Sequence, residues 1–240
     1  MRPPRLRLDH PWRVRHAHPM HGDSAEVPRP GWLLDAERVD RAIYAAIAAT
    51  DTPSLDRGMT RLTRAADHSK LSLAAAAVLS VTRGCKGRRA ACEGLASVAV
   101  TSAVANLVLK PLGRRRRPDR AADDVPLARH VPMPSTTSFP SGHSASAFAF
   151  ATGVGHVLPR DALALRTVAA LVAYSRVHTG VHYPSDVVSG AVIGVVTSRI
   201  VVQQFTRRAR LRPASAPPEP ASHAPGPARM ATFPDVGGRA

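Results

Sequence analysis

Apolar residues along the chain recur with helical spacing or form continuous runs. Two segments, 33–50 and 54–66, place apolar residues among charges in the amphipathic pattern of surface helices. Five longer apolar runs follow them. These runs cover residues 71–82, 90–112, 144–158, 162–174 and 187–205. The pattern predicts an all-α protein, a bundle of about five to six helices.

The apolar runs raise the question of a membrane. A helix needs about 20 apolar residues to cross a bilayer core of about 30 Å. Two of the five runs reach that length unaided, and the other three are shorter. Five buried helices of a soluble all-α domain are therefore the alternative. Because few charges interrupt the runs, we expect a membrane-embedded bundle.

The two ends of the chain differ in composition from its middle. Residues 1–32 are basic and hold six prolines, and residues 213–240 hold seven prolines among Ala, Ser and Gly. Such segments cannot bury a core. We expect a Pro-rich arm over 1–32, a helical domain over 33–208 and a disordered tail over 209–240. No cleaved secretory signal is expected, because no apolar segment of the usual length follows the arm.

The charge balance points to an anionic partner. Lys and Arg number 33 against 17 Asp and Glu, a net charge of +16. Nucleic acid, acidic lipid and a phosphorylated substrate all fit this excess. If the five runs cross a membrane alternately, the basic clusters at 83–89, 160–166 and 207–212 share one side, which the positive-inside rule makes cytoplasmic. The loop 113–141 then faces the other side, although it also carries a run of arginines.

Three short clusters fall on that second side, each near the end of an apolar run. They are Lys110-x6-Arg117-Pro118, Pro140-Ser141-Gly142-His143 and Ser175-Arg176-x5-His182-x3-Asp186. Taken singly, they are typical of a basic loop, a helix cap and a local hydrogen bond. Eleven specified positions in a fixed order are not expected by chance.

The residue types in these clusters suit a phosphate group. Lys110, Arg117 and Arg176 supply cations, and the planar fork of arginine matches pairs of phosphate oxygens. Ser141 and Gly142 open a helix whose first N–H groups lack partners and attract anions. Glycine also lets the backbone approach a ligand closely.

The same clusters hold groups able to transfer a phosphoryl group. Asp186 follows His182 by four residues, at a predicted helix start, where it can accept a hydrogen bond from the imidazole. Such a pair fixes the tautomer and leaves the other ring nitrogen free to attack. His143 comes from a different helix and can act as a general acid. For His68, His156 and His178 we expect structural roles.

At these residues the chain resembles the type 2 phosphatidic acid phosphatase and vanadium-dependent haloperoxidase superfamily. The signature spans residues 110–186, and a weaker likeness over 37–206 is to the phosphatase half of bacterial phosphatase–lipid kinase fusions. The resemblance implies that His182 is the nucleophile, that Asp186 is its carboxylate partner and that His143 is the acid for the leaving group. It also implies a set of phosphate-binding residues. These are Lys110, Arg117, Ser141, Gly142 and Arg176.

The function expected is that of a membrane phosphatase that hydrolyses a lipid phosphomonoester or diphosphate through a phosphohistidine. We expect no metal, no cofactor and no nucleic-acid partner, and a multi-pass location in the cell membrane with the active site on the extracytoplasmic face. Segment 33–50 is short and charged, so it is expected to lie in the interface. A vanadium haloperoxidase and a non-enzymatic binder of acidic lipid are the alternatives. The sequence does not name the lipid or give the oligomeric state.

Overall fold

The structure is a computed structural model that describes residues 30–211. The expected arm over 1–32 and tail over 209–240 therefore lie almost wholly outside the described residues. The described residues form helices and no strands, which confirms the all-α fold. The α-helices are α1 (Gly31–Ala49), α2 (Pro53–Ala65), α3 (Lys70–Thr82), α4 (Gly84–Ala103), α5 (Lys110–Gly113), α6 (Gly142–Val157), α7 (Pro159–His178) and α8 (Pro184–Leu211).

Shorter helical turns join these elements. A π-helical segment, Val104–Leu109, connects α4 to α5, so that helical structure continues from Gly84 to Gly113. Single 3-10 turns lie at Asp67–Ser69 and Leu127–Arg129. The sequence predicted each long helix, but it placed the start of α4 at residue 90, six residues late, because Gly84–Arg89 is rich in glycine and charge.

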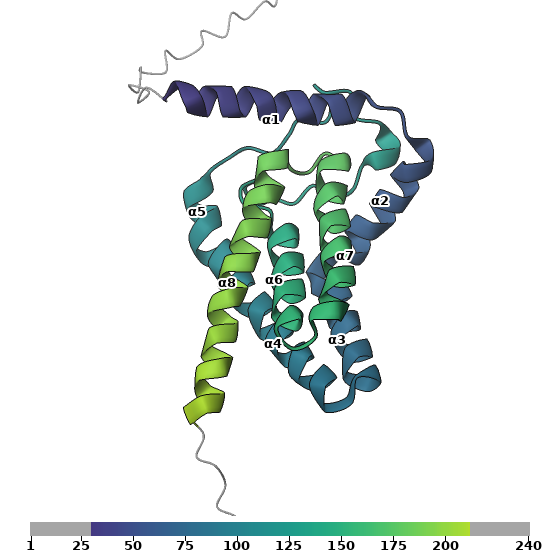
Figure 1. Ribbon diagram of the computed structural model, residues 1–240. Coiled ribbons are helices and arrows are strands. Elements are labelled where there is room, and N and C mark those ends of the chain that lie inside the picture. The colour runs from purple at the N-terminus through teal and green to yellow at the C-terminus, as the bar shows by residue number, and fades with distance from the viewer. Residues whose placement is uncertain (1–29, 212–240) are drawn as a thin grey trace, which may run out of the picture.

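Helix α6 lies in the middle of the bundle and packs against α4, α7 and α8, while α3 packs against α4 (Figure 1). Helix α1 lies across one end of this bundle, over the ends of α7 and α8. The apolar residues of α1 that face the bundle, Tyr44 and Ala48, are buried against α7 and α8 in a cluster with Val177 and Val187. This position suits an interfacial helix rather than a spanning one.

Small residues allow α6 and α8 to approach closely. A Cβ added at Gly190 would collide with the carbonyl oxygen of Ser141, and one added at Gly194 would collide with that of Ala145. Glycines four residues apart are typical of close contacts between membrane helices. The contact at Gly190 holds the start of α6 against the first turns of α8, which brings two of the three sequence clusters together.

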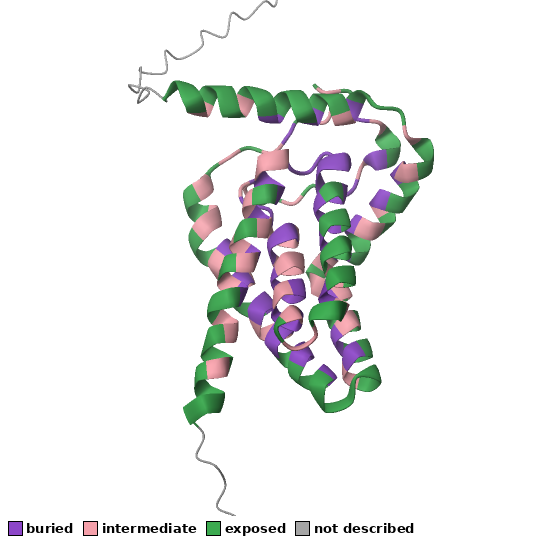
Figure 2. Cartoon of the chain, viewed as in Figure 1, coloured by how far each residue is buried: buried purple, intermediate pink, exposed green. Residues whose placement is uncertain are grey.

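Many positions on the outside of the helices are exposed (Figure 2), and a number of them carry large apolar side chains. On α8, exposed residues recur every four positions at Val188, Val192, Val196 and Ile200. Two stretches, Gly84–Gly113 and Pro184–Leu211, are long and apolar enough to span a bilayer, and only 33% and 39% of their most apolar windows are buried. Exposed apolar residues in this number suit a lipid environment. These features agree with the expectation of a membrane-embedded bundle.

The connections between helices gather at two opposite ends of the bundle (Figure 1). The α3–α4 turn, the α6–α7 turn and the end of α8 share one end, and these carry the predicted basic clusters. The loop 114–141 and the turn between α7 and α8 lie at the other end, beneath α1.

One buried arginine fixes the long loop to its surroundings. Arg129 is wholly buried, and its Nε donates to Asp56 Oδ1 at 2.8 Å. Its other nitrogens donate to the carbonyl oxygens of Ile47 and Thr50, at the end of α1. His178 Nε2 lies 2.9 Å from the same Asp56 oxygen, so this histidine has the structural role that we expected. The network ties α1, α2, α7 and the loop into one unit.

Candidate active site

The three sequence clusters meet at the end of the bundle that α1 covers. Lys110 comes from α5 and Arg117 from the loop after it, whereas Ser141, Gly142 and His143 begin α6. Arg176 lies in the last turn of α7 and Asp186 in the first turn of α8, with His182 in the connection between them. The structure thus brings together all eight residues that the motifs selected.

His182 is the residue around which this site is built. Its imidazole is almost wholly buried, and its backbone N–H donates to the carbonyl oxygen of Arg176 at 3.2 Å. Gly180, with φ +68°, makes the tight turn that follows α7. His182 Nδ1 lies 3.5 Å from Asp186 Oδ2, and Nε2 lies 3.2 Å from an Arg117 nitrogen. The ring therefore has a carboxylate on one side and a cation on the other.

The electrostatic surroundings keep this imidazole neutral. Burial, with the positive charges of Arg117 and Arg176, lowers the pKa of His182 to about 4, although Asp186 opposes the shift. At neutral pH the ring therefore retains an unprotonated nitrogen. Only an unprotonated nitrogen can attack phosphorus.

Asp186 is held in place by donors on both of its oxygens. Oδ2 accepts from the Tyr183 N–H at 2.9 Å and from the hydroxyl of Ser138, and Oδ1 accepts from Arg115 at 2.9 Å. The carboxylate is wholly buried. It cannot rotate away from His182 without breaking these bonds, so it can fix the orientation of the imidazole.

Arg115 links this carboxylate to α1. Its guanidinium also pairs with Asp40 of α1 and donates to Ser185 Oγ at 2.7 Å. Asp40 in turn accepts from the Ser185 backbone N–H at 2.8 Å, which caps the start of α8. Although the sequence offers four successive arginines, Arg117, the one selected by the motif, contacts His182, and Arg115 contacts Asp186.

Three cations and a helix start surround the space beside His182. Lys110 lies close enough to Arg117 and Arg176 for their charges to interact, and its Nζ would be 3.7 Å from a Cβ at Gly142. Arg176 is buried and donates to Thr63 Oγ1 at 2.9 Å, while its Nε has no hydrogen-bond partner among the described residues. Since none of the three has an ion pair within residues 30–211, this region favours an anion.

His143 has a carboxylate partner that the motifs did not include. Its Nε2 lies 2.9 Å from Asp67 Oδ1, and Asp67 comes from the short turn before α3. The two residues after Asp67, His68 and Ser69, have φ of 55° and 58°, in the left-handed region that non-glycine residues rarely adopt. This tight turn sets Asp67 against His143.

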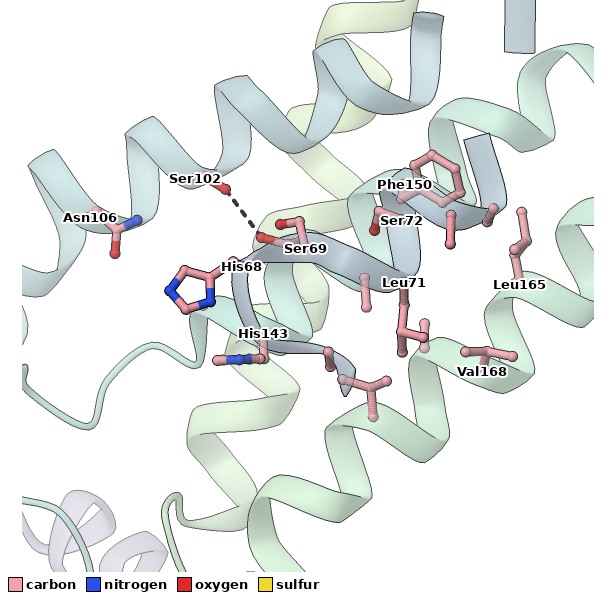
Figure 3. Close-up of a pocket in the computed structure, with 18 of the residues that line it drawn as sticks. His68, Ser69, Leu71, Ser72, Ser102, Asn106, His143, Phe150, Leu165 and Val168 are labelled. Atoms are coloured by element: carbon pink, nitrogen blue, oxygen red, sulfur yellow. Dashed lines mark hydrogen bonds between the residues drawn. The ribbon is translucent and has the colours of Figure 1, made fainter. Parts of the chain in front are cut away.

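A cavity of about 560 Å³ leads from these residues into the bundle between α3, α4, α6 and α7. Lys110, Gly142 and His143 line the polar end of the cavity, together with His68 and Asn106 (Figure 3). Its far end is apolar, where Figure 3 shows Phe150, Leu165 and Val168. A ligand that fits this cavity has a charged head and an apolar body. Within residues 30–211, no group of three or more His, Cys, Asp or Glu side chains is arranged to hold a metal ion.

Sequence reasoning missed Asp40, Asp67, Arg115 and Ser138. Asp67 and Asp40 lie far from the motifs in sequence, and Arg115 could not be distinguished from its neighbours. Ser138 lies only two residues before the second motif, but a lone serine in a loop carries no signal.

Curated relatives of this chain are phosphatases by name. The PAP2 superfamily matches residues 90–210. Decaprenylphosphoryl-5-phosphoribose phosphatase of Mycobacterium tuberculosis is 35% identical over 186 residues, which cover 74% of this chain and 98% of that protein. Lipid A 1-phosphatase of Rhizobium johnstonii is 34% identical over 116 residues, 46% of each protein.

Two solved structures share the fold. A transmembrane PAP2-type phosphatidylglycerolphosphate phosphatase from Bacillus subtilis has a TM-score of 0.56 at 25% identity, covering 74% of this chain and 90% of that one. LpxE from Aquifex aeolicus has a TM-score of 0.54 at 25% identity, covering 69% and 95%. The expected resemblance and the expected class of activity, a membrane phosphatase of lipid phosphates, are confirmed at this level. The chain belongs to the PAP2 superfamily.

Proposed function

We propose that this protein removes a terminal phosphate from a membrane lipid through a phosphohistidine at His182. The observation that carries the proposal is the buried His182–Asp186 pair at the head of an apolar cavity, beside three cations that have no ion pair within residues 30–211. A polyprenyl-linked sugar phosphate is the first substrate to test, since a relative with that named substrate matches over nearly its whole length.

The proposed reaction has two steps. In the first, His182 Nε2 attacks phosphorus and the bond to the lipid oxygen breaks, while His143 gives its proton to that oxygen. In the second, water gives a proton to His143 and attacks the phosphohistidine, which releases phosphate and restores His182. Lys110, Arg117, Arg176 and the first N–H groups of α6 hold the phosphoryl oxygens in both steps. Ser141 caps α6, and Gly142 leaves room for the phosphate.

Asp67 has a positioning role in this scheme. By accepting from His143 Nε2, it leaves Nδ1 to deliver the proton to the leaving oxygen. The negative charge of a bound phosphate favours the protonated form of the His143 imidazole. The phosphatase names of the relatives favour this hydrolysis over the vanadate-dependent oxidation of a haloperoxidase.

We further propose that the protein crosses the cell membrane several times, with the active site on the extracytoplasmic face. The separation of the connections into two ends supports this, because the basic clusters all fall at the end away from the active site. The arginines of the loop 114–141 do not contradict the rule, since Arg115 and Arg117 are engaged in the site.

Replacing His182 by Ala is expected to lower kcat by about 10³-fold or more, because the nucleophile is lost. With p-nitrophenyl phosphate, an alkaline quench and mass spectrometry should detect a phosphoryl group on His182 of the wild type. The His143→Ala variant should accumulate more of it, since the second step lacks its base. A His182→Ala protein with activity within tenfold of the wild type would exclude this mechanism.

Replacing Asp67 by Asn is expected to slow alkyl phosphates by about tenfold and p-nitrophenyl phosphate much less, because only a poor leaving group depends on the acid. Asp161→Asn is the matched control, as Asp161 pairs with Arg83 at the other end of the bundle. Equal losses for both ester types would mean that Asp67 has only a structural role.

Filling the cavity should raise KM for long-chain lipids alone. Val168 lines the apolar end and Leu171, on the same helix, does not, although both side chains are about two-fifths exposed. We expect Val168→Phe to raise KM for a long-chain phosphate by about tenfold, since each CH₂ excluded loses about 0.8 kcal/mol. Leu171→Phe should change neither that KM nor the one for p-nitrophenyl phosphate. Preference of the wild type for soluble phosphates over every lipid tested would refute the lipid assignment.

Labelling of introduced cysteines tests the proposed topology. Cys85 and Cys92 are exposed and are replaced by Ser first. In whole cells, an impermeant maleimide should label Ala122→Cys, in the long loop, and spare Ala209→Cys, near the end of α8. Labelling of both positions from outside would show that the two ends do not lie on opposite sides of the membrane.

A further inference from the structure

A second cavity lies at the end of the bundle away from the active site. It measures about 610 Å³ and lies between the last turns of α6, the first half of α7 and the second half of α8. Four arginines line it, and no acidic residue does. They are Arg166, Arg199, Arg207 and Arg210. His156 also lines it, and Glu93 holds Nδ1 of that ring at 2.6 Å.

The four guanidinium groups have no partner among residues 30–211, neither an ion pair nor a hydrogen bond. Other arginines at this end are paired: Arg83 lies 2.6 Å from Asp161, and Arg89 lies 2.9 Å from Glu93. Glu93 already contacts Arg89 and His156, so it does not neutralise the cavity. The cavity therefore has a concentrated positive charge that the described chain leaves unbalanced.

Two of these arginines, Arg166 and Arg199, lie farther from the helix ends than the charges that set the orientation of a membrane protein. Arg199 follows Asp186 by thirteen residues, about 20 Å along α8, within a bilayer core of about 30 Å. Arg166 lies seven residues into α7, about 10 Å from its start. The positive-inside rule accounts for arginines in the connections. It does not account for two arginines from different helices that line one cavity at this depth. Both residues are exposed on the bundle, and an unpaired charge that faces lipid is costly.

We propose that this cavity binds a phosphate group at a site separate from the catalytic one. Arginine side chains converging from two helices can hold several oxygens of one phosphate. A basic pocket between membrane helices suits the headgroup of an anionic phospholipid, and a soluble phosphate has the same chemistry. The inference rests on the membrane-embedded fold and does not depend on the phosphatase mechanism.

The test compares two double variants of the full chain. Arg166→Gln/Arg199→Gln removes one charge from α7 and one from α8 within the cavity. Arg160→Gln/Arg208→Gln removes the same number from the same helices at the same end, but from residues that do not line this cavity. Activity toward p-nitrophenyl phosphate should be unchanged in both, which shows that each variant folds. If the first double variant does not fold, the single variants Arg166→Gln and Arg199→Gln take its place.

Binding is measured by native mass spectrometry of detergent-solubilised protein titrated with dioleoyl phosphatidylglycerol, a diester that a phosphomonoesterase does not cleave. The wild type and the Arg160/Arg208 control should bind one phosphatidylglycerol with similar affinity. The Arg166/Arg199 variant should bind it at least tenfold more weakly, and phosphatidylcholine should bind all three proteins equally. In a parallel titration, millimolar inorganic phosphate identifies a soluble ligand if it displaces phosphatidylglycerol from the wild type, and a lipid if it does not. Equal binding of phosphatidylglycerol by all three proteins would overturn the proposal.

Discussion

The arrangement of the site depends on the fixed position of one buried carboxylate, that of Asp186. A buried charge is stable only where donors surround it. Here three donors come from two separate parts of the chain, namely Arg115 and Ser138 of the long loop and the backbone of Tyr183 before α8. Because Arg115 also pairs with Asp40, the helix that lies across the bundle takes part in holding the His182–Asp186 pair. The loop, α1 and α8 therefore cannot move independently without exposing or unpairing this charge.

A shortage of acidic partners for the nearby cations explains why the space beside His182 attracts phosphate. Among residues 30–211, three acidic side chains around the site are already engaged: Asp186 with Arg115, Asp56 with Arg129, and Asp67 with His143. Lys110, Arg117 and Arg176 are left with hydrogen bonds to neutral groups or with none. The three positive charges repel one another in a partly buried site. A ligand with two or more negative charges relieves this repulsion. A phosphate group thus replaces the missing counterions.

The sequence was sufficient for the helices and for the motif residues, but not for the groups that orient them. Apolar runs and helix-end motifs are local patterns, so His182, Asp186 and the residues proposed to bind phosphate could be selected from the three motifs and the family resemblance that they carry. The partners that orient them act through tertiary contacts. Asp67 lies 76 positions before His143, and Asp40 lies 75 positions before Arg115. The positive φ of His68 and Ser69, which brings Asp67 to His143, has no sequence signal either, because neither residue is glycine.

The position of the cavity connects the phosphate chemistry to the membrane. The cations lie at the end of the bundle that α1 covers, whereas the space that leads away from them runs between α3, α4, α6 and α7. Large apolar side chains are exposed on the outer faces of α3, α4 and α7. A soluble phosphate would fill only the charged end and leave apolar walls hydrated. A lipid phosphate covers both, so that burial of its chain adds binding energy that a water-soluble ester of the same chemistry cannot supply. The binding energy of the lipid chain is gained next to the phosphate group. Preference for a lipid substrate therefore follows from the placement of His182 at the head of the cavity and needs no separate recognition element.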